Sequence, residues 1–155
     1  MVVAGTGHRP QFCPCKFNDN HPWLISLKQR LTKYLKDEDV SLVISGAAIG
    51  FDTWLAECAI DANIPFHLYI PFVGQASKWP KESQDKYNFL KEKAQKCLYI
   101  SEEYSKEAFF KRDRAMIDNA DSVVSLLNPE ASSGGTYYTV MYAKGAGKNV
   151  VNFWV

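Results

Sequence analysis

Three short segments rich in glycine, serine and threonine contain the residue types that bind phosphate groups. They are Gly5-Thr6-Gly7-His8-Arg9, Ser45-Gly46-Ala47-Ala48-Ile49-Gly50 and Ser132-Ser133-Gly134-Gly135-Thr136. Glycine lets the backbone turn sharply and approach a ligand closely, and free N–H groups at a following helix start attract anions. Each segment alone also fits an ordinary strand-to-helix turn, because none has the full dinucleotide or P-loop signature. Three of them in one short chain favour a phosphate-binding cradle.

Two arginines are placed to join this cradle. Arg9 ends the first glycine segment, and Arg112 lies on the helix expected before the apolar run at 122–127. A guanidinium group presents a fork of donors that suits a phosphate or a carboxylate. Each position is equally compatible with a surface or salt-bridged arginine.

Three further residues are assigned to the ligand-binding set. Asn128 follows the apolar run at 122–127, and Gln75 and Trp79 lie in the loop after the run at 66–71. Trp79 would stack on a base and Gln75 would hydrogen-bond to it. The alternative is that this loop is a lid that packs locally.

Carboxylates are the groups that would act as acids or bases at a glycosidic bond. Asp52, Glu57 and Asp113 are the candidates, and Glu57 and Asp113 join Arg112 as candidate catalytic residues. Asp52 belongs to the ligand-binding set and equally supports the start of the second helix. Glu57 equally fits a polar helix surface.

A metal site is not expected. Cys13 and Cys15 have His8 and His21 nearby, but structural zinc takes four ligands with paired spacing, and a second pair is missing. No cofactor is required beyond a nucleotide ligand.

Apolar runs alternate with amphipathic stretches, which is typical of βαβ units and a parallel sheet. Strands are expected at 1–5, 40–45, 66–71, 97–100, 122–127 and 150–154. Helices are expected from Pro22, at 52–62, at 81–96, after Ser105 and at 137–146. The sequence therefore predicts one Rossmann-like α/β domain over residues 1–155, with a mainly parallel sheet flanked by helices.

The bulk composition narrows the class of protein. The chain has 155 residues and a formal net charge of +1, so no global basic field attracts nucleic acid. No apolar run is long enough to span a bilayer, no signal peptide is expected, and four cysteines are too few for a secreted disulfide scaffold. A cytoplasmic protein with no membrane contact is expected.

Read in order, the motifs resemble the SLOG superfamily, which includes DprA and the LOG phosphoribohydrolases, and most closely its YpsA-type branch. The resemblance rests on segments 6–10 (TGHRP), 45–57 (SGAAIGFDTWLAE), 70–79 (IPFVGQASKW), 112–121 (RDRAMIDNAD) and 133–139 (SGGTYYT). It implies a nucleotide-derived ligand between the three glycine segments, and a homo-oligomer. The LOG loop ends in a catalytic glutamate, and that position is Thr139 here, so LOG-type hydrolysis is not implied.

Three functions follow from these observations. The first is binding of a phosphorylated nucleotide or nucleotide-derived ligand, with relatives of NAD and ADP-ribose among the candidates, by a sensor or carrier. The second is hydrolysis or transfer at the N-glycosidic bond of a nucleoside monophosphate. The third, DprA-like binding of single-stranded nucleic acid, is disfavoured because the chain lacks an interleaved basic and aromatic stripe.

Overall fold

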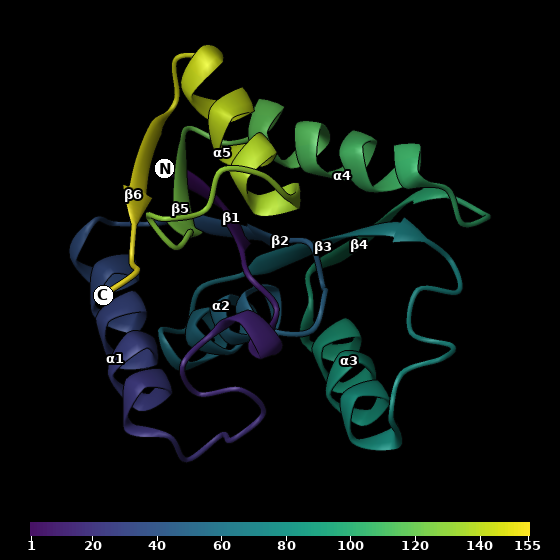
Figure 1. Ribbon diagram of the computed structural model, residues 1–155, viewed down its shortest axis with the longest axis horizontal. Coiled ribbons are helices and arrows are strands. Elements are labelled where there is room, and N and C mark those ends of the chain that lie inside the picture. The colour runs from purple at the N-terminus through teal and green to yellow at the C-terminus, as the bar shows by residue number, and fades with distance from the viewer.

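Six parallel strands form a single sheet with helices on both of its faces, as the computed structural model of residues 1–155 shows (Figure 1). The strands are β1 (Val2–Gly7), β2 (Leu42–Ser45), β3 (Phe66–Phe72), β4 (Lys96–Ser101), β5 (Ser122–Leu126) and β6 (Asn149–Asn152). Their order across the sheet is β4-β3-β2-β1-β5-β6, and every neighbouring pair is parallel. The predicted Rossmann-like α/β fold is confirmed.

Five α-helices form two layers around this sheet. Helices α1 (Pro22–Asp37), α2 (Phe51–Asp61) and α3 (Lys81–Lys93) cover one face, and α4 (Lys106–Asp118) and α5 (Gly135–Gly145) cover the other (Figure 1). A short 3₁₀ helix, η1 (Pro10–Phe12), follows β1. Helix α1 illustrates why the amphipathic stretches fold as they do, because its buried leucines recur every three or four residues, at Leu24, Leu27, Leu31 and Leu35.

The inner strands are buried on both faces because their side chains alternate between two apolar clusters, whereas the edge strands β4 and β6 are partly exposed. In β1, Val3 belongs to a cluster of 24 buried residues that includes α1 and α2, whereas Ala4 belongs to a cluster of 8 buried residues that includes α4. In β2, Val43 and Ile44 divide between the clusters in the same way. The sheet is therefore the rigid centre from which all the connecting loops project.

The strand order reverses at β1, and this reversal fixes where the loops gather. Strands β2, β3 and β4 extend from one side of β1, whereas β5 and β6 lie on its other side. In open parallel sheets a crevice forms at such a switch point, outside the carboxyl ends of the strands. The turns after β1, β2 and β5 all lie at this edge.

The first glycine turn leads into η1 and a loop, and α1 begins at Pro22, where the sequence predicted it. Of the three glycine turns, only those before α2 and α5 lead directly into α-helices.

Among all the helices, none combines the length and the apolar character that a membrane crossing needs.

Candidate functional site

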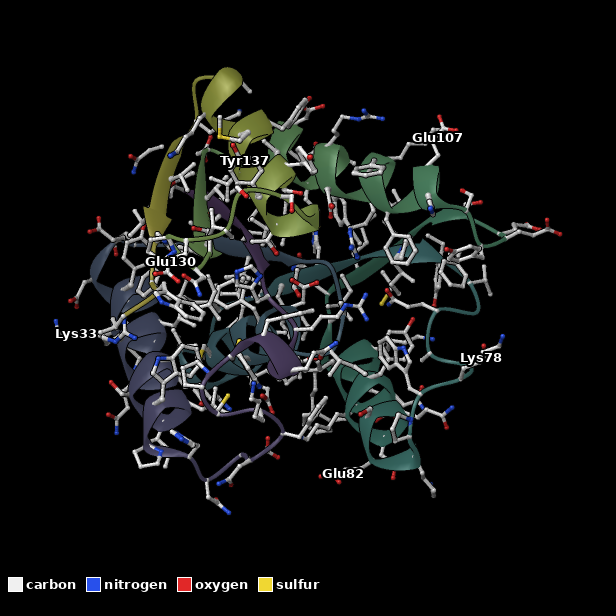
Figure 2. All side chains as sticks on the ribbon, viewed as in Figure 1. Lys33, Lys78, Glu82, Glu107, Glu130 and Tyr137 are labelled. Atoms are coloured by element: carbon white, nitrogen blue, oxygen red, sulfur yellow. The ribbon has the colours of Figure 1, made fainter.

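A cleft of about 680 Å³ lies at the carboxyl ends of β1 and β5. Most of the predicted ligand-binding residues line it, together with the candidate acid Asp113: they are Gly5, Thr6, Gly7, His8, Arg9, Asp52, Arg112, Asn128, Ser133, Gly134, Gly135 and Thr136. Figure 2 shows Glu130, another lining residue, on the segment that joins β5 to α5, and Tyr137 in the first turn of α5, whereas Lys33, Lys78 and Glu107 project at the periphery. The first and third glycine segments thus meet in one cavity.

The third glycine turn forms an open wall of the cleft. Gly134 has a φ of +100°, which favours glycine, and it precedes the first turn of α5 without supplying a capping side chain. A Cβ atom on Gly135 would find no protein atom within 4 Å. Neither packing nor backbone angle therefore requires glycine at position 135, which lines the cleft.

The second glycine turn is closed by the protein itself. Ser45 Oγ accepts a hydrogen bond from the Ala47 amide at 3.3 Å, and Asp52 Oδ2 accepts one from the Ala48 amide at 3.2 Å. The Phe51 amide at the start of α2 donates to the carbonyl of His8 at 3.3 Å. Three amides of this turn and helix start, those of Ala47, Ala48 and Phe51, are therefore already bonded to protein acceptors.

Glycines in this region mainly allow close packing between protein segments. A Cβ on Gly50, whose φ is +102°, would lie 2.8 Å from the His8 carbonyl oxygen and 2.9 Å from Arg9 Cα. A Cβ on Gly46 would lie 2.7 Å from the Arg112 Nη1 atom. Ser45, Gly46 and Gly50 lie outside the cleft lining. The close approaches at Gly46 and Gly50 hold this turn against Arg112 and the first glycine segment.

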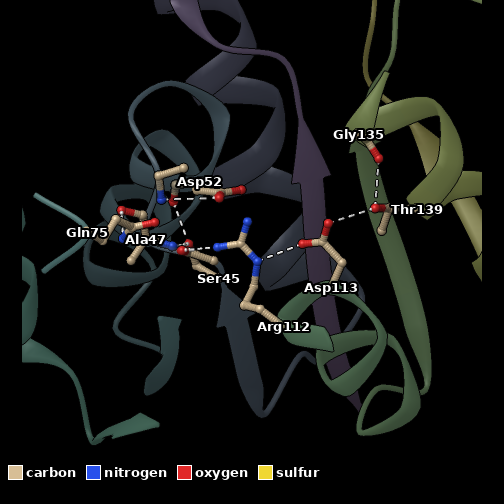
Figure 3. Close-up of polar contacts among 10 residues, drawn as sticks. Ser45, Ala47, Asp52, Gln75, Arg112, Asp113, Gly135 and Thr139 are labelled. Atoms are coloured by element: carbon tan, nitrogen blue, oxygen red, sulfur yellow. Dashed lines mark hydrogen bonds and ion pairs between the residues drawn. The ribbon is translucent and has the colours of Figure 1, made fainter. Parts of the chain in front are cut away.

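Arg112 connects three elements beneath the cleft (Figure 3). Its side chain is buried, and its Nη1 atom donates to the Gly46 carbonyl at 2.6 Å while Nε donates to Asp113 Oδ1 at 2.6 Å. The second oxygen of Asp113 lies 3.1 Å from Thr139 Oγ1, which is also 2.8 Å from the Gly135 carbonyl. One chain of contacts thus runs from the β2–α2 turn to the third glycine turn.

The carboxyl group of Asp52 has a raised pKa. Burial raises its pKa to about 6, and the nearby Asp113 carboxylate acts in the same direction, whereas Arg112 and the Ala48 amide oppose the rise. Two arginines, Arg9 and Arg112, line the cleft together with three carboxylates, of which Glu130 is the third. Arg9 is exposed and takes part in none of the ion pairs of the chain, so it is the cation left for a ligand.

His8 holds the loop after β5. Its Nε2 atom accepts a hydrogen bond from the Asn128 amide at 3.0 Å, so this nitrogen is unprotonated in the neutral ring. Burial lowers its pKa, which favours that neutral form. The ring also packs edge-on against Trp154, with centroids 5.9 Å apart. His8 therefore fixes one side of the cleft by a contact that needs no charge.

Three further predicted site residues, besides Ser45, Gly46 and Gly50, are not brought to the cleft. Glu57 pairs with Lys28 at 3.1 Å on the outer side of α2. Trp79 packs edge-on against Tyr87 of α3, with ring centroids 5.3 Å apart. Gln75 is buried, and its Nε2 atom lies 3.4 Å from the Ala47 carbonyl. For the loop after β3, the structure supports the alternative of local packing.

Cys13 and Cys15 are packed inside the protein. Cys13 and Cys15 are free and buried, and burial raises the pKa of Cys13 to about 12. No group of three or more histidine, cysteine, aspartate or glutamate side chains has an arrangement that would hold a metal ion.

Sequence reasoning missed the apolar part of the cleft. Phe12 from η1 and Phe109, Phe110 and Met116 from α4 line it, beside the smaller residues Ala48, Ala131 and Ser132. The available signal was two phenylalanines beside functional motifs, Phe12 after TGHRP and Phe109 before RDRAM. Their convergence depends on how α4 crosses the sheet, which no local pattern encodes.

Known structures share this fold at low sequence identity. DprA from Helicobacter pylori, a single-stranded DNA-binding protein, superposes with a TM-score of 0.69 at 19% identity, over 98% of this chain and 64% of its own. DprA from Streptococcus pneumoniae gives 0.67 at 16% identity, over 97% and 50%. The molybdenum cofactor carrier protein of Chlamydomonas reinhardtii gives 0.59 at 14% identity, over 97% and 75%. These likenesses concern the fold alone.

Sequence comparisons identify the family. A UPF0398 protein of Staphylococcus haemolyticus is 26% identical over 136 residues, which cover 81% of this chain and 72% of that protein. One from Brevibacillus brevis is 26% identical over 144 residues, with coverages of 84% and 74%. The family model described as the YspA SLOG family matches residues 3–155. Since that match spans nearly the whole length, the chain belongs to the YpsA family of SLOG proteins, as its ordered motifs indicated.

Proposed function

We propose that this protein binds a phosphorylated nucleotide or nucleotide-derived ligand in the cleft, as a sensor or carrier. The observation that carries the proposal is Gly135, a glycine that the protein's own packing does not require. It lies in the first turn of α5, where the helix dipole and uncapped amides favour an anion. The absence of a side chain there leaves a path by which a phosphate reaches these amides.

The charges of the cleft support a ligand that combines phosphate with hydroxyl groups. Arg9 and the amides at the start of α5 suit phosphate oxygens, whereas Asp52, Asp113 and Glu130 accept hydrogen bonds from sugar hydroxyls. A polyanion is disfavoured because three carboxylates face two arginines, of which Arg112 already serves Gly46 and Asp113. The fold of this chain is similar to that of a molybdenum cofactor carrier protein, and a carrier also binds a small molecule. The similarity extends only to the fold.

The proposal is tested by calorimetric titration with nucleoside monophosphates, dinucleotides and ADP-ribose. Gly135→Leu should abolish binding because its side chain fills the approach path to the amides. Gly145→Leu is the matched control, because Gly145 lies at the other end of α5 and has equally open surroundings. Wild-type protein that gives neither heat nor a thermal shift with any of these compounds would refute the proposal.

A second candidate function is cleavage of an N-glycosidic bond, and one observation favours it. Asp113 Oδ2 lies 3.1 Å from Thr139 Oγ1. Thr139 occupies the position of the catalytic glutamate in the LOG enzymes that this chain resembles, so a carboxylate lies beside that position. In such a reaction water would form a bond to the ribose C1′ carbon as the C1′–N bond breaks. The base would leave with a proton, and Asp113 would be the group that stabilises or activates the ribosyl centre.

Chromatography of nucleoside monophosphates after incubation with the protein distinguishes the two functions. A pure binder releases no free base. If Asp113 catalyses the reaction, wild-type protein releases base and Asp113→Asn does not, whereas Glu57→Gln, which alters a carboxylate outside the cleft, keeps the activity. Base release that Asp113→Asn leaves unchanged would remove Asp113 from the reaction.

A further inference from the structure

Aromatic rings from two different parts of the chain line the cleft, and the proposed contacts to phosphate and ribose do not use them. Phe12 comes from η1, the short purple helix after β1, and Phe109 and Phe110 come from α4 (Figure 1). Phosphate and sugar hydroxyls have polar partners elsewhere in the cleft. Three apolar rings beside them indicate that another part of the ligand is flat and weakly polar.

Phe12 contributes little to the protein core. Its side chain is 64% exposed. Its flanking residues are nevertheless firmly held: Pro10 and Cys13 are buried, the Phe12 amide donates to the Arg9 carbonyl at 3.0 Å, and the Cys13 thiol lies 3.4 Å from the same oxygen. The backbone thus presents an exposed ring at a fixed place in the cleft, which folding does not require.

The ring on the α4 side is held in a fixed orientation. Phe109 packs edge-on against Phe72 and Tyr104, with centroid distances of 5.8 and 6.1 Å. The Arg112 guanidinium carbon lies 5.7 Å from the Phe109 ring centroid. Phe110, the next residue, is 46% exposed and lines the same cleft. This wall is therefore prearranged and lies beside the arginine network.

We propose that the cleft contains a base-stacking subsite whose platform is Phe12, with Phe109 and Phe110 on the α4 side. This inference rests on the proposed function and adds to it which part of the chain recognises the base. Base–aromatic stacking tolerates different bases because every base has a π-face. The subsite therefore selects nucleotides over sugar phosphates without strong preference among bases, and it takes the role first assigned to Trp79.

Calorimetry with two ligands, one with a base and one without, tests this subsite. The probes are ribose 5-phosphate and whichever of AMP, GMP, CMP and UMP binds wild-type protein most tightly. The variants are Phe12→Ala, Phe12→Tyr, which keeps an aromatic ring, and Phe17→Ala. Phe17 is the matched control, since it lies in the same loop at 68% exposure and lines a different depression.

Phe12→Ala should weaken nucleotide binding by about 5-fold to 100-fold, the range expected for one lost stacking contact. It should leave ribose 5-phosphate binding unchanged, and Phe12→Tyr and Phe17→Ala should bind both probes like wild type. Equal effects of Phe12→Ala on the two probes, or none on either, would overturn the subsite while leaving the proposed function intact. If neither probe binds wild-type protein, the proposed function fails for this ligand class, and the subsite fails with it.

Discussion

At the scale of single residues, the raised pKa of Asp52 should make the free energy of unfolding depend on pH. Its folded-state pKa of about 6 exceeds the ordinary aspartate pKa of 3.8, so the folded protein binds more protons than the unfolded chain between these values. The contribution of protonated Asp52 to the free energy of unfolding is therefore complete below pH 3.8, and it is lost as the pH rises through 6. We expect Asp52→Asn, which stays neutral, to be about 2–3 kcal/mol more stable than wild type at pH 7.5.

Urea denaturation at pH 2.5 and pH 7.5 checks this expectation. The difference between Asp52→Asn and wild type should nearly vanish at pH 2.5, which lies below both pKa values, so that Asp52 is protonated in the folded and the unfolded state. Asp39→Asn is the control, because Asp39 is exposed and its substitution should give a small effect at either pH. An Asp52→Asn protein that is less stable than wild type at pH 7.5 would mean that attraction to Arg112 outweighs burial.

Arg112 is a residue whose loss should affect stability as well as binding. Its guanidinium donates to the Gly46 carbonyl and to Asp113, so Arg112→Ala removes the donor from a buried carbonyl and the opposite charge from the half-buried Asp113 carboxylate. We expect a decrease of about 2–3 kcal/mol in the free energy of unfolding, with weaker ligand binding. Arg114→Ala is the matched control, since Arg114 is exposed on the same helix. Equal stabilities of the two variants would show that the network contributes little.

At the scale of elements, the joint between β1 and α2 positions the cleft. The start of α2 touches the first glycine turn through the Phe51 amide and the His8 carbonyl, and only a glycine fits at position 50 between them. Gly50→Ala introduces both an unfavourable φ and a clash with Arg9 Cα. We expect it to lower the free energy of unfolding by about 2 kcal/mol or more and to weaken nucleotide binding.

Thermal and urea denaturation of Gly50→Ala and Gly74→Ala provide the comparison. Gly74 lies in the loop after β3, where a Cβ would meet its nearest atom at 3.9 Å and φ imposes no strain. Gly74→Ala should therefore resemble wild type. If Gly50→Ala were equally harmless, the close approach of the two turns would not be needed to hold η1 and Phe12.

At the scale of the whole molecule, the outer surface of α4 and α5 is the region suited to self-association. Tyr138, Met141 and Tyr142 of α5 are 54%, 47% and 37% exposed. Clustered exposed apolar side chains are typical of interaction surfaces. We expect the protein to form a homo-oligomer through this face, and Met141→Glu to dissociate it because the interface would bury a charge.

Sedimentation equilibrium measures this directly. Phe89→Glu is the control, because Phe89 is 49% exposed on α3 in the opposite helix layer. A wild-type protein that is monomeric at micromolar concentration contradicts the expectation. So does an oligomer that Phe89→Glu dissociates and Met141→Glu does not.

The periodicity of the sequence predicted the order and the type of the main elements. Leucines at helical spacing place α1, and the short apolar runs place the strands, most clearly β5, in which every residue is buried. The boundaries shifted by a few residues: β1 extends to Gly7, and α5 begins at Gly135. Glycine-rich turns also predicted where the cleft lies, because parallel strands bring their carboxyl ends to one edge.

Only the tertiary structure decided what each glycine and polar side chain does there. Gly50 and Gly135 look alike in the sequence, yet a Cβ on the first would strike neighbouring backbone, whereas one on the second would meet no protein atom. Trp79 packs on Tyr87, and Phe12 reaches the cleft. Arg112 contacts a carbonyl 66 positions away in the sequence. A residue's type and local spacing fix its chemistry and its element, but its partners depend on which elements pack together across the sheet.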